Sequence, residues 1–258
     1  INHKAKGSNT PLEIARALKH TEIVSLLQQH SGVSMRSTKP RKKLRKKMKS
    51  AIASGDADKV KTLLDSGMIG VNDVIHRGAT VLSFACTKGH VDVVSVLLKQ
   101  KDVLVNQAGK DGATPLYEAC VNEHVDVVQL LLARIDIKIN QADQNGITPL
   151  SAASTVGSED IVQLLLAKKE IQINQANKHG ITPLHIACQK GRVDVVRLLL
   201  TRKEIQINQA DENGATPLYI ACVMGHVDVV KALLTKKDLN INHKAKGSNT
   251  PLEIARAL

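Results

Sequence analysis

The stretch GITPLHIACQKGRVDVVRLLL, residues 180–200, contains two short apolar segments separated by a glycine. The first begins at Thr182-Pro183. Proline suits the first turn of a helix because its φ is preset and the helix would leave the missing donor unpaired anyway. The second segment, VDVVRLLL, has apolar residues at helical spacing. The stretch therefore predicts two short antiparallel helices, neither of which can bury its apolar face alone.

The same frame recurs along the chain in steps of 34 residues, set by Thr80, Thr114, Thr148, Thr182, Thr216 and Thr250. Clusters such as QADQNG and QADENG separate the units, and their Asx and Gly residues predict tight turns. Stacking such units buries a continuous core. A repeat of this period therefore predicts an all-α repeat solenoid.

The pattern resembles the ankyrin repeat family. The resemblance is carried by TPLHIA at 182–187, by GHVDVV at 225–230, and by the recurring Asn72, Asn106, Asn140, Asn174, Asn208 and Asn242. It covers residues 46–258 and 1–30, and it implies a turn plus two antiparallel helices in each 34-residue unit, with terminal caps. The family's unit has about 33 residues. The additional residue here follows the second helix, where LLLAKKEIQIN replaces the family's Gly-Ala-Asp turn.

The repeat register also divides the chain into segments. Met48 and Ala51 take core positions of an amino-terminal cap, and Arg256 takes a position that is Cys or Ser in the full repeats, as an outer cap requires. The predicted segments are a displaced copy of the carboxy-terminal cap at 1–30, a basic linker at 31–45, the amino-terminal cap at 46–74, full repeats at 75–108, 109–142, 143–176, 177–210 and 211–244, and a truncated carboxy-terminal cap at 245–258.

Residues 1–18 are identical to residues 241–258. The neighbouring repeats that begin at Gly180 and Gly214 share only 12 of their first 18 residues, so duplication within the array explains the identity poorly. A circularly permuted chain, or a reading frame assembled around a circle, explains it better. We expect residues 250–258 to fray, because a helix of one or two turns is marginal in water. We also expect residues 1–30 to dock on the repeat that ends near residue 244, within one chain or between chains.

The positive charge is concentrated before the first cap. Of the net charge of +12, nine charges lie in residues 36–49, which leaves +3 for the rest of the chain. The run comprises Arg36, Lys39, Arg41, Lys42, Lys43, Arg45, Lys46, Lys47 and Lys49. It predicts a nuclear import signal, or binding to nucleic acid or an anionic membrane. The alternative is a solvated, disordered lead-in. Without interleaved aromatic residues, base stacking is not expected.

Several classes of function are disfavoured. No apolar run approaches a membrane span and no secretory signal is visible. The sequence offers no phosphate loop, nucleophile elbow or metal-binding histidine pair, so we expect no enzyme activity, no metal and no cofactor. The calcium-like loop QADQNGITPLSA has Gln141 and Ala152 where acids are needed. The cysteines fall one to a layer, beyond disulfide reach, which indicates a reducing, intracellular location, cytoplasmic or nuclear: Cys86, Cys120, Cys188 and Cys222.

The resemblance implies a scaffold that binds a protein partner. In the family, the two positions after the Ala-Cys pair face a concave groove; here they are Thr87, Lys88, Val121, Asn122, Thr155, Val156, Gln189, Lys190, Val223 and Met224. The turn tips are Lys110, Asp111, Gln144, Asn145, Lys178, His179, Glu212 and Asn213. An apolar row of Val121, Thr155, Val156, Val223 and Met224 predicts a partner helix or extended peptide.

Four further expectations remain. Tyr117 and Tyr219 serve either as partner anchors or in packing. The resemblance implies that His90, His124, His185 and His226 satisfy backbone groups between helices and loops. A rival function is a nucleic-acid- or membrane-associated protein that acts through residues 36–49. Another is an engineered or permuted repeat scaffold that self-associates through the duplicated cap.

Overall fold

In the computed structural model, residues 38–246 and 249–257 are described. The predictions for residues 1–37, which include the displaced cap, therefore lie outside the described residues. The chain divides into a unit that ends at Leu44 and a unit that begins at Arg45, and all the repeats belong to the second unit.

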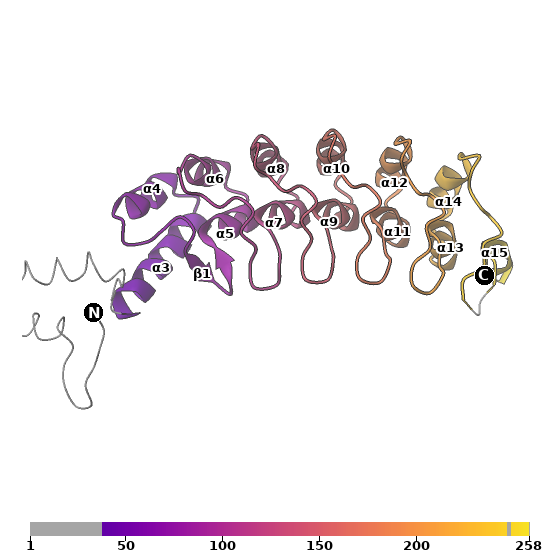
Figure 1. The fold of residues 1–258 in the computed structure, drawn as a ribbon, viewed down its shortest axis with the longest axis horizontal. Coiled ribbons are helices and arrows are strands. Elements are labelled where there is room, and N and C mark those ends of the chain that lie inside the picture. Colours follow the sequence, from indigo (N-terminus) through magenta and orange to yellow (C-terminus); the bar gives the residue numbers. More distant parts are fainter. Residues whose placement is uncertain (1–37, 247–248, 258) are drawn as a thin grey trace, which may run out of the picture. The chain divides into compact units, whose positions relative to one another are not determined.

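Helices of the second unit form two rows, first helices in one and second helices in the other (Figure 1). The first helices are α5 (Val81–Lys88), α7 (Pro115–Val121), α9 (Pro149–Val156), α11 (Pro183–Gln189) and α13 (Pro217–Val223). The second helices are α6 (Val91–Leu98), α8 (Val125–Leu132), α10 (Glu159–Leu166), α12 (Val193–Leu200) and α14 (Val227–Leu234). Before them come α3 (Thr38–Ala53), α4 (Ala57–Asp65) and the hairpin of β1 (Val74–His76) and β2 (Ala79–Thr80), and after them comes α15 (Pro251–Ala257).

The repeated threonine and proline start each first helix as predicted. In α9, the Thr148 hydroxyl accepts a hydrogen bond from the Ser151 N–H at 3.1 Å, and Pro149 takes the first position. Gly157 ends the helix with φ of 91°, a conformation that glycine adopts without steric cost. A Cβ at Gly157 would lie 2.7 Å from the Arg192 side chain, so the next repeat also needs a glycine there.

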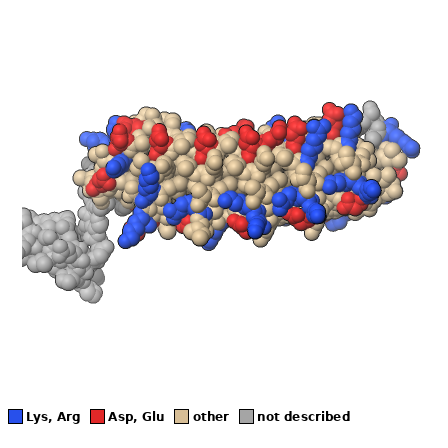
Figure 2. Space-filling view, turned by 90° about the horizontal axis from the view of Figure 1, so that it is seen from above, with Lys and Arg blue, Asp and Glu red and all other residues tan. Residues whose placement is uncertain are grey.

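The second helices start differently, with charge in place of a side-chain cap. Each described second helix from α6 to α14 has an acidic residue in its first turn: Asp92, Asp126, Glu159 and Asp160, Asp194, and Asp228. A carboxylate there interacts favourably with the helix dipole. Acidic residues accordingly form a row along one long edge of the surface in Figure 2. This row is explained by helix stability and needs no ligand.

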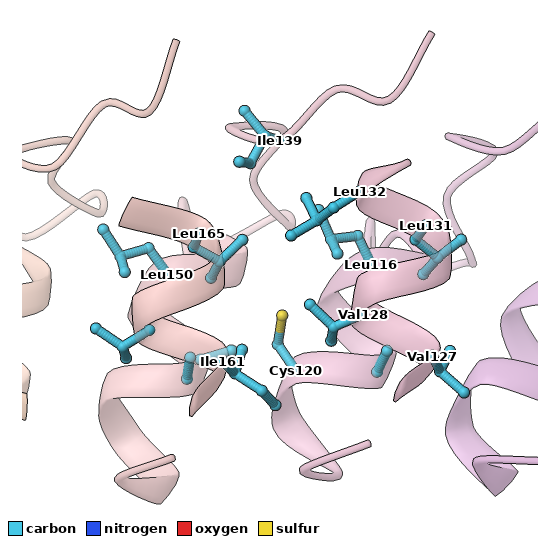
Figure 3. Close-up of a cluster of buried hydrophobic side chains, with 14 of the residues drawn as sticks. Leu116, Cys120, Val127, Val128, Leu131, Leu132, Ile139, Leu150, Ile161 and Leu165 are labelled. Carbon is cyan, nitrogen blue, oxygen red and sulfur yellow. The ribbon is translucent and has the colours of Figure 1, made fainter. Parts of the chain in front are cut away.

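The core is continuous from layer to layer. Leu131 of α8 and both Ile161 and Leu165 of α10 are fully buried, and Figure 3 shows them within one cluster of apolar side chains. Cys120 belongs to the same cluster, and burial raises the pKa of its thiol. All four cysteines are free and buried. Their expected structural role is therefore confirmed.

The recurring asparagines join consecutive repeats. The Asn140 side chain donates to the Glu170 carbonyl at 2.7 Å and accepts from the Gln172 N–H at 2.9 Å. Asn72, Asn106, Asn174 and Asn208 make the same two bonds to the repeat that follows each of them. The loop after each second helix is thereby fixed to the preceding repeat. The sequence contained the period of these residues but not their bonds.

Both predictions about the ends need correction. Residues 38–45 are not a disordered linker, because α3 begins at Thr38 and runs on through the cap, where Met48, Ala51 and Ile52 are buried. At the other end, residues 251–257 form α15 and do not fray. Thr250 and Glu253 cap this helix reciprocally, because the Thr250 N–H donates to the Glu253 carboxylate at 2.7 Å and the Glu253 N–H donates to the Thr250 hydroxyl at 3.2 Å.

Candidate binding surface

The predicted partner positions lie on one surface, which we name the first-helix face. It consists of the carboxyl-terminal ends of α5, α7, α9, α11 and α13 together with the loops that precede these helices. Of the ten predicted positions, Lys88, Asn122, Gln189, Lys190, Val223 and Met224 are exposed, while Thr87, Val121, Thr155 and Val156 are half-buried. The Thr155 hydroxyl donates to the Ser151 carbonyl at 2.9 Å, so its polar group is already paired.

The apolar row is therefore shorter than predicted. Val121 packs against the core, whereas Val223 and Met224 are 42% and 46% exposed. Val227, at the start of α14, is 62% exposed and was missed by the sequence analysis. These three residues form the apolar end of the first-helix face, and the exposed apolar surface is confined to its last full repeat.

The tyrosines and His185 share one repeat position, but their surroundings differ. His185 is fully buried, and its Nε2–H donates to the Ala215 carbonyl at 3.1 Å. Burial lowers the pKa of His185. Tyr117 and Tyr219 are half-buried. Burial and the nearby Asp143 raise the pKa of Tyr117. His185 thus has the expected structural role, and each tyrosine combines packing with a partly exposed ring.

The other histidines tie each repeat to the one before it. The Nε2 atoms of His90, His124 and His226 donate to the carbonyl groups of Ala53, Thr87 and Gln189 at 3.1–3.2 Å. Arg192, at the same repeat position, reaches the Thr155 carbonyl at 3.2 Å. The backbone-satisfying role implied by the family resemblance is confirmed for these histidines. Among the described residues, no group of His, Cys, Asp or Glu could hold a metal ion.

All eight predicted turn-tip residues are exposed. Backbone bonds join each tip to the next, as where the Lys178 N–H donates to the Asn145 carbonyl at 3.1 Å and the Glu212 N–H donates to the His179 carbonyl at 3.1 Å. His179 Nδ1 and the Glu212 carboxylate also lie 2.9 Å apart. The tips therefore form a continuous hydrogen-bonded edge of the first-helix face.

Glu118 is a polar residue of this face that sequence reasoning missed. Its carboxylate accepts a hydrogen bond from the Thr87 hydroxyl at 3.0 Å, and burial raises its pKa despite that bond. The positions equivalent to Glu118 are Phe84, Ala152, Ile186 and Ile220. A single acid in an otherwise apolar position was the available signal. A cluster of basic residues around Phe84 was missed as well.

The basic run continues into the first cap. Among the run's residues whose side chains are described, Lys42, Lys43, Lys46 and Lys47 are exposed, and Arg45 and Lys49 are half-buried. The side chains of Arg36, Lys39 and Arg41 lie outside the described residues. No helix in the described part of the chain combines the length and apolar character needed to cross a membrane.

Comparison with known proteins agrees with this architecture. A family model for ankyrin repeats in three copies matches residues 47–143 and 135–211, and a model for ankyrin repeats in many copies matches residues 190–234. The crystal structure of the human ASB11 ankyrin repeat domain is similar, with a TM-score of 0.68 and 28% sequence identity over 81% of this chain and 90% of that one. No curated protein sequence matches. The chain belongs to the ankyrin repeat family.

Proposed function

We propose that this protein is a non-enzymatic intracellular scaffold whose partner contacts the apolar end of the first-helix face. Ankyrin repeats are generally protein–protein interaction modules. The observation that carries the proposal is the simultaneous exposure of Val223, Met224 and Val227. The positions equivalent to Met224 in earlier repeats are Lys88, Asn122, Val156 and Lys190, so this end is unusually apolar. Exposed apolar patches mark interaction sites, and this one fits a partner helix or an extended peptide.

The test is a cross-linked, nuclease-treated pull-down from cell lysate with the double variant Val223→Ser/Met224→Ser. Truncating two interface anchors costs about 1 kcal/mol or more each, so we expect recovery of the direct partner to fall at least about tenfold. Ile135→Ser is the matched control, because Ile135 is fully exposed after α8 and outside the first-helix face. Equal recovery with wild type and with Val223→Ser/Met224→Ser would contradict the proposal.

The basic run supplies a further arm of the same experiment. Neutralising Lys42, Lys43, Lys46 and Lys47 together leaves the apolar end unchanged. If this variant loses its partners while Val223→Ser/Met224→Ser keeps them, the run binds the partner, nucleic acid or membrane, and the repeats only carry it. Binding through phosphate groups would also fall steeply with salt.

Self-association is a second candidate function, favoured by an open apolar face beside α14. Leu234 is 56% exposed, whereas Leu132, Leu166 and Leu200 at the same repeat position are 4–6% exposed. Ile241 is 45% exposed, against 2% for its equivalents Ile139, Ile173 and Ile207. In inner repeats a second helix covers these positions. In sequence, KHTEIVSLLQQH at 19–30 follows the copy of residues 241–258 and has the pattern of such a helix.

We propose that residues 10–30 of one copy cover this face on another copy. Residues 31–37 span at most about 25 Å, short of the roughly 50 Å between the first cap and α14 at about 10 Å per layer, which favours association between copies. Sedimentation equilibrium at 1–100 µM should show mass rising with concentration, and either Leu234→Asp or Ile23→Asp should abolish the rise. A constant monomer mass, or an equal effect of the control Ile135→Asp, would contradict self-association.

A further inference from the structure

Basic side chains gather around Phe84 at the amino-terminal end of the first-helix face. The Lys49 and Lys88 ammonium groups lie 5.9 and 5.7 Å from the centre of the Phe84 ring. The His76 ring meets the same ring edge-on at 5.5 Å. Lys49 Nζ also donates to His76 Nδ1 at 3.2 Å. We name Lys49, His76, Arg77 and Lys88 the cationic end of the face.

The positive charges of the cationic end lack partners of opposite charge. Burial, and then the charges of Lys49, Arg77 and Lys88, lower the pKa of His76, which shows that all three cations lie near this imidazole. Among the ion pairs of the described residues, none includes Lys49, Arg77 or Lys88. Several cations are therefore held close together with no acid to offset their mutual repulsion, which an anionic ligand would relieve.

This arrangement occurs in one repeat only. The positions equivalent to Arg77 are Asp111, Asn145, His179 and Asn213, none of them Lys or Arg. Arg77 has φ of 44°, a left-handed conformation that is uncommon for a residue other than glycine. Backbone strain of this kind concentrates at functional sites. The β1–β2 hairpin places Arg77 at its turn, beside His76.

We propose that the cationic end binds the carboxylate side chains of an acidic peptide segment in a protein partner. The inference rests on the proposed scaffold function, because it assigns one end of the partner's binding surface. Arg77 can hold a carboxylate with two hydrogen bonds, and the lysines add point charges. Such charge complementarity contributes to association rate and specificity.

Two features favour a peptide over a nucleic acid. Phe84 is only 6% exposed, so its ring cannot stack on a base as single-strand binding requires. In the next repeat, the equivalents of Phe84 and Arg77 are Glu118 and Asp111, which would repel a phosphate backbone continuing along the face. The cationic end is thus limited to a short anionic segment.

The test is fluorescence anisotropy of a labelled peptide with six glutamates between Gly-Ser flanks, compared with its six-glutamine counterpart. For Arg77→Asn/Lys88→Ser we expect at least tenfold weaker binding of the glutamate peptide, since Asn tolerates the left-handed backbone. The control Lys169→Ser/Lys203→Ser removes equal charge from exposed positions away from the face and should change affinity less than twofold. Lys88→Glu alone gives a second variant that leaves the hairpin intact, and it should also abolish binding.

Three results would overturn the proposal: no saturable binding by wild type, equal weakening in both double variants, or tighter binding of a six-nucleotide single-stranded DNA through the same residues. Equal weakening would mean diffuse attraction to a basic protein. The variant Val223→Ser/Met224→Ser should bind the glutamate peptide normally. Failure at the cationic end can therefore be distinguished from failure of the apolar end, which the pull-down measures.

Discussion

Replacing Leu200 by alanine is expected to lower the free energy of unfolding by about 3 kcal/mol, the usual cost of a cavity at a buried leucine. The same replacement at Leu234 should cost less than about 1 kcal/mol. The two leucines occupy the same position in consecutive repeats, yet Leu200 is 5% exposed and Leu234 is 56% exposed. Side chain and local helix are matched, so the difference measures what covering by the next layer contributes.

Urea denaturation followed by circular dichroism at 222 nm measures both variants. It should be done at low micromolar concentration, where association between copies would not cover Leu234. The slope of the unfolding free energy against urea must stay constant for the comparison to hold. Equal losses for Leu200→Ala and Leu234→Ala would show that layer-to-layer burial is not the main source of stability.

The second large effect is expected for Asn140→Ala, at about 2 kcal/mol. This substitution removes two hydrogen bonds to the following repeat and leaves the Glu170 carbonyl and the Gln172 N–H without their side-chain partner. A typical intramolecular hydrogen bond contributes about 1 kcal/mol, and losing one partner of a pair costs more than removing both. The same denaturation experiment measures this loss.

Two variants sharpen that test. Asn140→Asp keeps the acceptor for Gln172 but loses the donor to Glu170 and places a charge beside that carbonyl, so it should destabilise at least as much as alanine. Asn242→Ala is the control, because among the described residues the Asn242 side chain joins no following repeat; it should cost less than about 0.5 kcal/mol. Similar losses at Asn140 and Asn242 would assign the asparagines a role within their own repeat.

Predictions of local structure succeeded where the cause lies within a few residues. Thr148 and Pro149 start α9, and Gly157 ends it, through contacts along the chain that a short motif contains in full. The period then placed Met48 and Ala51 in the core, as found. The predictions failed at the ends, where no neighbouring unit repeats the pattern. There α3 extends the cap, and the Thr250–Glu253 pair stabilises a helix expected to fray.

The binding surface was less accessible to sequence reasoning. The motif positions located the first-helix face, but it did not distinguish half-buried Val121 from exposed Val223, because exposure depends on neighbouring layers. Glu118 was missed because its hydrogen bond comes from Thr87, 31 residues earlier. The cationic end was missed for the same reason, since it assembles Lys49, His76 and Lys88 from three elements.

By itself, the sequence determined the all-α ankyrin repeat fold, the positions of the helices and the absence of a disulfide framework. Each follows from short motifs repeated in register, which specify local hydrogen bonds and an apolar face. The tertiary structure alone decided which leucines are covered, which asparagine bonds join the layers, and where unpaired charge and apolar surface coincide. These properties depend on distances between residues about one repeat apart, and such distances exist only once the layers have stacked.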